Sequence, residues 1–178
     1  MPEETLAFCL RQVVEALVAF HSLGIPHGRV HTSSVFVPDD GVVKLAGTSF
    51  LDGEGEGGEG GGEGGGEEGE EGGEGGRGGS KVPWCSPEEI RKETVGAAAD
   101  IWAVGCLAVH MATGALPWAQ VGDEDQVRLF IAHSRALPDL PPDSSPQLID
   151  FVATCLDRDP SRRPTAARLV DHPFLAAC

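Results

Sequence analysis

A stretch of 27 residues, Gly53 to Gly79, limits what this chain can fold into more than any other feature. It consists of 17 Gly, nine Glu and one Arg, and it contains no apolar residue. Such a segment cannot bury enough apolar surface to offset the conformational entropy lost on ordering, so we predict that it is disordered. The fold must therefore come from the residues before and after it, with residues 53–79 as an insert in a surface loop.

The remaining residues suit one domain. The chain has 178 residues, of which 40% are hydrophobic, and a chain of this length can form one core. The net charge is −15, and the insert carries −8 of it. This acidity argues against a nucleic-acid partner, because phosphate binding depends on Lys and Arg. The insert is either a tolerated repeat expansion, which we favour, or an acidic arm for a basic partner or cations.

The cysteines and the hydropathy indicate the compartment. Five Cys, an odd number, contain no CxxC pair, and no apolar signal segment opens the chain. We therefore expect a reduced cytoplasmic protein, with the nucleus as the alternative. Cys106 and Cys155 stand in apolar helical patterns and are expected in the core. No run of 18 apolar residues occurs, so we expect no membrane contact.

Before the insert, the pattern predicts one helix and one hairpin. The helix begins at Pro2-Glu3-Glu4, continues through an apolar face spaced by three and four residues, and ends at Gly24. Residues 35–37 and 42–45 are typical of short strands, and Pro38-Asp39-Asp40-Gly41 between them is typical of a turn.

After the insert, the pattern is helical. Residues 97–113 are apolar nearly all round, which predicts a helix at the centre of the domain. A second helix is expected from Asp123 to about His133, and a third after its N-cap Ser145. Thr165 is expected to cap a last short helix that Pro173 closes. The predicted fold is therefore mainly α with one β-hairpin.

Six short motifs occur in the order and spacing found in protein kinases. They are His21–His27, Val42–Ala46, Trp84–Glu88, Ala99–Cys106, Arg158–Ala166 and His172–Leu175. The chain outside the insert resembles the C-terminal lobe of serine/threonine kinases, nearest the STE group and its MAP kinase kinase kinases. The resemblance implies a kinase-like lobe over residues 1–178, with the insert in the position of the activation segment. It also implies that the N-terminal lobe, which binds nucleotide, is absent from this chain.

The resemblance implies structural roles for four residues. Asp100 should accept hydrogen bonds from the backbone of the catalytic loop. Glu88 should form a buried ion pair with Arg163, and His27 should pack rather than take part in chemistry. Trp102 and Trp118 are also expected to be packing residues.

The positions that carry catalysis in the family hold other residues here. The resemblance puts Arg29 at the position of the catalytic base, His31 at that of the phosphate-contacting Lys, and Ser34 and Gly47 at those of the metal-binding Asn and Asp. Arg29 cannot accept a proton. Gly47 has no side chain and Ser34 has a neutral hydroxyl, whereas magnesium prefers anionic oxygens. We therefore expect no intact catalytic, cofactor or metal site.

Binding of ATP and magnesium is expected only if an N-terminal lobe and a substitute carboxylate, such as Asp52, are present. A His27–His31 pair without a carboxylate is expected to be structural rather than a ligand pair.

The resemblance also bears on regulation. The Arg that receives an activation-loop phosphate in the family is replaced by Gly28 here, and the Thr that helps to select substrates is replaced by Lys81.

Four hypotheses follow. The first is a pseudokinase-type domain that signals by binding a protein, with another kinase among the candidate partners, and that is inactive as an enzyme by itself. The second is an active ATP-dependent serine/threonine kinase whose N-terminal lobe is missing from this chain. The third is an acidic binding arm on an inert scaffold, and the fourth is a gene remnant without function.

Overall fold

The computed structural model describes residues 1–38, 41–47 and 81–176. The Gly- and Glu-rich insert and Asp52 lie outside these residues, so the predictions made for them stay predictions. Among the described residues, no helix is both long and apolar enough to cross a bilayer.

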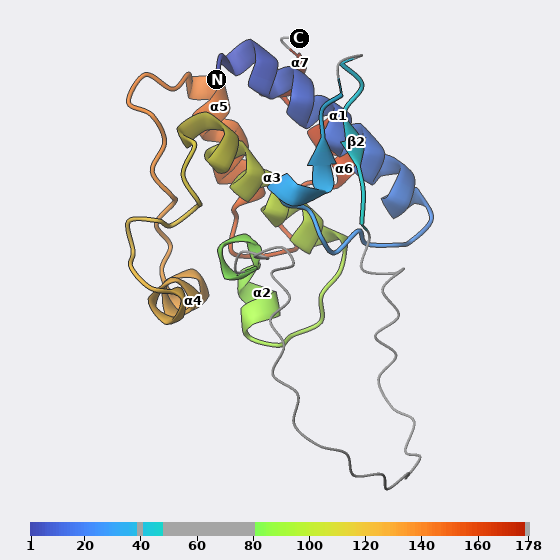
Figure 1. Ribbon diagram of the computed structural model, residues 1–178. Coiled ribbons are helices and arrows are strands. Elements are labelled where there is room, and N and C mark those ends of the chain that lie inside the picture. Colours follow the sequence, from blue (N-terminus) through green and yellow to red (C-terminus); the bar gives the residue numbers. More distant parts are fainter. Residues whose placement is uncertain (39–40, 48–80, 177–178) are drawn as a thin grey trace, which may run out of the picture.

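The central element is helix α3 (Ala97–Thr113), with α1 (Glu3–Ser22) and α5 (Pro146–Cys155) packed against it (Figure 1). All residues from Ala99 to Val109 are buried, so the helix has no solvent face over this stretch. It ends at Gly114, whose φ of 75° is left-handed and therefore favours glycine. The predicted central helix is confirmed.

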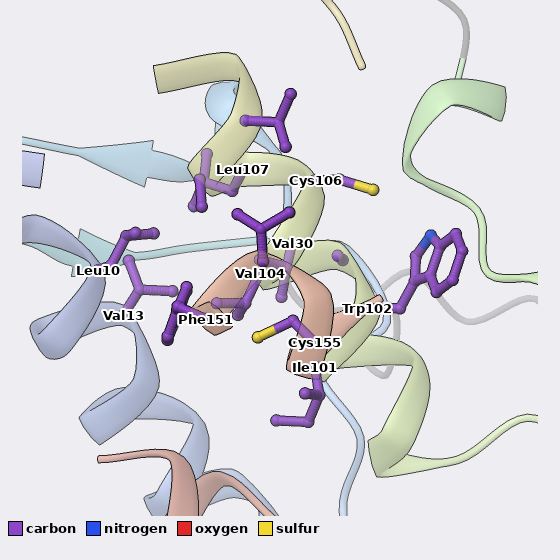
Figure 2. Close-up of a cluster of buried hydrophobic side chains, with 14 of the residues drawn as sticks. Leu10, Val13, Val30, Ile101, Trp102, Val104, Cys106, Leu107, Phe151 and Cys155 are labelled. Atoms are coloured by element: carbon purple, nitrogen blue, oxygen red, sulfur yellow. The ribbon is translucent and has the colours of Figure 1, made fainter. Parts of the chain in front are cut away.

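The core lies where these three helices meet. Figure 2 shows side chains of α1, α3 and α5 pointing into one cluster, and they are almost fully buried: Leu10, Val13, Val104, Leu107, Phe151 and Cys155. Gly105 lets α3 approach α5 closely, because a Cβ at this position would lie 2.7 Å from the Cβ of Cys155. Cys106 and Cys155 are core residues, as predicted.

The hairpin is present but shorter than predicted. Strand β1 (Val35–Phe36) pairs antiparallel with β2 (Lys44–Leu45), and the hairpin lies beside α1 in Figure 1. Val43 does not extend β2, because its N–H donates to the Gln12 side chain of α1 at 3.0 Å instead of to the other strand. The Gln12 amide in turn donates to the carbonyl of Gly41 at 3.3 Å. These contacts fix the hairpin to α1.

Capping residues begin the outer helices, and the caps Ser145 and Thr165 were predicted, whereas Asp123 was expected as the first helical residue. Asp123 caps α4 (Glu124–His133), Ser145 caps α5, and Thr165 caps α6 (Ala166–Leu169). The prediction that Pro173 closes the last helix is wrong: it begins a separate helix, α7 (Pro173–Ala176). Proline is well suited to the first turn of a helix, where its missing N–H is not needed.

Three short elements complete the fold. They are the 3₁₀ turns η1 (Thr32–Ser34) and η3 (Val82–Trp84) and the single-turn helix α2 (Pro87–Ile90). Helix α2 has a capping box: Ser86 accepts the N–H of Glu89, and the Glu89 carboxylate accepts the N–H of Ser86 at 2.6 Å. Ser34, which the sequence analysis singled out, lies in η1, and Glu88 lies in α2.

Candidate functional site

Asp100 is buried on α3 and fixes the loop that follows α1. Its carboxylate accepts the backbone N–H groups of His27 and Gly28, both at 2.7 Å. It also accepts a hydrogen bond from His21 Nε2 at 2.8 Å. Only 2% of the residue is exposed, so these donors take the place of the water molecules that the carboxylate loses on burial. The structure therefore brings Asp100 to the loop backbone.

Glu88 and Arg163 form a buried bidentate ion pair, although 75 positions separate them. The two nitrogen–oxygen distances are 2.6 and 2.8 Å. Arg163 also donates to the carbonyls of Asp157 and Ala98. Burial alone would raise the pKa of Glu88, but hydrogen bonds from Arg163 and from the backbone lower it below its ordinary value of 4.5. Glu88 is therefore a charged residue with a structural role.

Arg158 is a half-buried cation whose role the sequence analysis did not assign. Its guanidinium lies 4.9 Å from the ring centre of Trp102 and 5.5 Å from that of Trp118. It donates to the carbonyls of Ile131 and Ala136. Burial lowers its pKa to about 10, so it stays charged at neutral pH. The sequence did contain a signal for this contact: two tryptophans predicted to pack in the core and an arginine in the same helical part of the chain.

The loop from His27 to Ser34 is held by its own side chains. His27 is fully buried, and its ring meets that of Phe20 edge to face at 5.3 Å. Burial lowers the pKa of His27, which keeps its imidazole neutral at pH 7. The Ser34 hydroxyl accepts the N–H of His31 at 3.0 Å and donates to its carbonyl at 2.7 Å. Both side chains therefore hold the loop in place.

A cavity of about 70 Å³ lies beside this loop; we call it the loop pocket. Its walls are the loop residues Gly28–His31, the face of α3 that carries Ala99 and Ala103, and the side of η3 formed by Lys81, Trp84 and Cys85. Glu89 and Asp100 also line it. The structure thus brings Arg29, His31 and Lys81 together, while Ser34 and Gly47 are not part of the wall.

The loop pocket combines cationic and acidic side chains. Its cationic side chains are Arg29 and Lys81, with His31 beside them, and its carboxylates are Glu89 and Asp100. Burial lowers the pKa of His31, and the positive charges of Arg29 and Lys81 lower it further. No group of three or more His, Cys, Asp or Glu in the described part of the chain is placed to hold a metal ion.

Known proteins match nearly the whole of this chain. The protein kinase domain model matches residues 77–175. Mitogen-activated protein kinase kinase kinase 3 of Arabidopsis thaliana is 30% identical over 174 residues, which are 98% of this chain and 25% of that protein. Mitogen-activated protein kinase kinase kinase A of Dictyostelium discoideum is 29% identical over 97% of this chain and 17% of its own length.

A human relative extends this result. Mitogen-activated protein kinase kinase kinase 4 of Homo sapiens is 28% identical over 181 aligned residues, which cover 100% of this chain and 11% of that protein. The chain thus spans a quarter or less of the length of these three relatives. The domain match covers more than half of the chain and includes the Glu88–Arg163 pair and Asp100. This chain belongs to the protein kinase family.

Proposed function

We propose that this chain is a catalytically silent member of the protein kinase family that acts by binding another protein. The observation that supports the proposal best is Arg29 in the loop pocket, at the position where the family has its base. A guanidinium stays protonated and accepts no hydrogen bond. It can neither orient a substrate hydroxyl nor take its proton, which is the role the base has in phosphoryl transfer.

The two carboxylates that line the loop pocket do not replace the base. The Asp100 oxygens accept three N–H donors, from His21, His27 and Gly28. The Glu89 carboxylate accepts both the N–H and the hydroxyl of Ser86, at 2.6 and 2.7 Å. Moving either carboxylate toward a substrate would leave buried donors without acceptors, which costs about 1–3 kcal/mol for each donor.

The buried charged residues that stabilise the fold are present, although the family's catalytic positions hold other residues. Buried ion pairs are costly to desolvate and are stable only when every partner is present. Glu88, Arg163 and Asp100 meet this condition, so the domain presents a firm surface near a pocket without catalytic groups. A rigid, non-catalytic domain of this kind suits a role in protein binding.

A phosphotransfer assay tests the proposal. The 178-residue chain and the longest polypeptide that contains it are incubated with γ-labelled ATP, magnesium and a mixed Ser/Thr peptide substrate. We expect no label above that of a heat-denatured sample. The matched control is the triple exchange Arg29→Asp, Ser34→Asn and Gly47→Asp in the longer polypeptide. Among the described residues, no atom lies within 4 Å of a Cβ built at Gly47, and Asp tolerates the strained positive φ of this position better than most residues.

The assay also tests the second candidate, an active kinase of the MAP kinase cascade. The observation that favours it is about 30% identity to mitogen-activated protein kinase kinase kinases over nearly the whole chain. Transfer that depends on magnesium and disappears in Asp52→Ala would support this candidate and reject ours. The partner protein, the cytoplasmic or nuclear location and the acidic arm remain predictions.

A further inference from the structure

We propose that a groove at the end of the molecule where α1 begins is a docking site for a basic segment of a partner protein, in which Lys or Arg side chains alternate with aliphatic ones. The inference rests on the proposed function, because it assigns the protein-binding role to one surface. The groove is separate from the loop pocket, with which it shares no described residue.

Two cavities, of about 400 and 320 Å³, meet at Glu3 in the first turn of α1 and form the groove. The first extends from α1 to the C-terminal part of α3 and to the loop that leads into α5, and the second extends from α1 to the start of α5 and to α7. In Figure 1, α1 begins beside α5 and α7, at the end of the molecule opposite α2. We call the two cavities together the acidic groove.

The charged side chains of the acidic groove are carboxylates. Glu3 lines both cavities, Asp143 lines the first and Glu4 lines the second. None of the described residues that line the groove is Lys, Arg or His. Glu3 accepts the N–H and the hydroxyl of Ser145. Asp143 is exposed and forms no hydrogen bond or ion pair with the described residues, so its charge is open to a cation of a partner.

The neighbouring cation on α1 does not neutralise these carboxylates. Arg11 follows Ala7, a wall residue, by about one turn of the helix. Its guanidinium contacts Glu15 at 3.0 Å and donates to the carbonyl of Leu175 at 3.3 Å. Arg11 is therefore occupied outside the groove.

The floor of the acidic groove is apolar and holds one unpaired polar atom. Leu6 and Leu148 line the first cavity and Phe174 lines the second, and each is at most 3% exposed. The hydroxyl oxygen of Ser144, in the wall of the first cavity, is buried and has no hydrogen-bond partner among the described residues. A buried hydroxyl without a partner is unfavourable, so a peptide group that enters the cavity would gain a hydrogen bond there.

Charge and shape together indicate the occupant. Carboxylates at the rim attract Lys and Arg side chains, while the apolar floor accepts aliphatic side chains. The same carboxylates repel nucleic acid, whose binding depends on Lys and Arg. Two connected cavities suit a segment of chain better than a single side chain.

Binding is measured at pH 7 and low salt by NMR of the methyl groups of Leu6, Ala112 and Leu148 in the 178-residue chain. The α-amino group of Met1, which lines the first cavity, is acetylated so that it does not compete. The probe is a blocked heptapeptide of alternating Arg and Leu. One control peptide has citrulline for every Arg, which removes the charge but keeps the shape, and another has Ser for every Leu. We expect saturable shifts with the probe, weakened by added salt, and at least about tenfold weaker binding of both controls, which equals roughly 1.4 kcal/mol.

A charge reversal locates the site. Asp143→Lys should weaken binding of the probe at least about tenfold, roughly 1.4 kcal/mol. Asp139→Lys is the matched control, because Asp139 is exposed, lies in the same loop and lines neither cavity. It changes the net charge equally and should bind the probe within about twofold of the parent chain.

Several results would overturn the inference: no saturable shift at Leu6 or Leu148, equal affinity of the probe and its citrulline form, or equal affinity of Asp143→Lys and Asp139→Lys. Shifts confined to residues 53–79 would assign the binding to the acidic insert instead. Loss of the response in the longest polypeptide that contains this chain would show that another part of that polypeptide covers the groove. These failures are distinct from a positive phosphotransfer assay, which would reject the proposed function and leave the peptide titration unchanged.

Discussion

The two buried carboxylates Glu88 and Asp100 differ from the cationic side chains of the loop pocket, which Asp100 also lines, in how their charges are balanced. Glu88 and Asp100 are both 2% exposed, and each has several fixed donors. Arg29 lines the pocket, at the position where the sequence analysis places the catalytic acid of the family. The acids that hold the fold are thus present, whereas the acid needed for catalysis is predicted to be replaced. Under the proposed function, charge that serves stability and charge that serves catalysis are separated within one domain.

The largest effect should come from breaking the buried ion pair. Glu88→Gln leaves the Arg163 guanidinium uncompensated and should lower the free energy of unfolding by about 3–5 kcal/mol, measured by urea denaturation. The double exchange of Glu88 and Arg163 to Met should recover much of this loss. Arg162→Met is the control, since Arg162 pairs with Asp157 but is 72% exposed, and it should cost less than about 1 kcal/mol. A loss below about 1 kcal/mol in Glu88→Gln would contradict the structural role of the pair.

Asp100→Asn should have the next largest effect. An amide has one oxygen and presents an NH₂ group where the carboxylate accepts an N–H, so we expect a loss of about 1.5–3 kcal/mol. Amide exchange at His27 and Gly28 should accelerate as well. Asp150→Asn, at a 70% exposed side chain that contacts His172, provides the control and should change neither quantity. Unchanged exchange at His27 and Gly28 would show that Asp100 does not hold the loop.

A pH titration also tests the buried Glu88–Arg163 ion pair. The pKa of Glu88 is lowered in the folded state, so its contribution to stability is present above 4.5 and is lost as the pH falls through the lowered pKa. The associated slope is at most about 1.4 kcal/mol per pH unit. Carboxyl carbon NMR should give a Glu88 midpoint below 4.5. A Glu88 midpoint above that value would mean that burial outweighs the Arg163 pair.

The smallest effect is expected in the loop pocket. Lys81 is exposed, so Lys81→Thr should change the free energy of unfolding by no more than about 0.5 kcal/mol. The measurement is the urea midpoint, compared with that of Glu88→Gln. A loss of about 2 kcal/mol or more, which is four times that expectation, would show that Lys81 stabilises the fold as the buried carboxylates do.

The fold was largely predictable because its helices carry strong local signals. The apolar run of α3, the acidic start at Asp123, and the caps Ser145 and Thr165 predicted their helices correctly. Two details depended on tertiary context. Val43 leaves the strand because Gln12 of α1 takes its N–H, and Pro173 begins a helix although proline after a helix is also a common end signal.

The site was predictable only in part. Motif order could suggest that Glu88 meets Arg163, because the family pattern contains that long-range information. The stacking of Arg158 on Trp102 and Trp118 and the convergence of Arg29 with Lys81 require the spatial packing of segments. No helical or strand period in the sequence relates positions so far apart.

Calorimetric titration of ATP into the longest polypeptide that contains this chain, with and without magnesium, tests the central claim most directly. We predict no heat that depends on magnesium in the natural sequence, because Ser34 and Gly47 stand at the positions where the sequence analysis places the metal-binding Asn and Asp of the family. We predict magnesium-dependent binding only after Arg29→Asp, Ser34→Asn and Gly47→Asp are combined. Magnesium-dependent ATP binding by the natural sequence, with phosphate transfer to a peptide, would contradict the central claim.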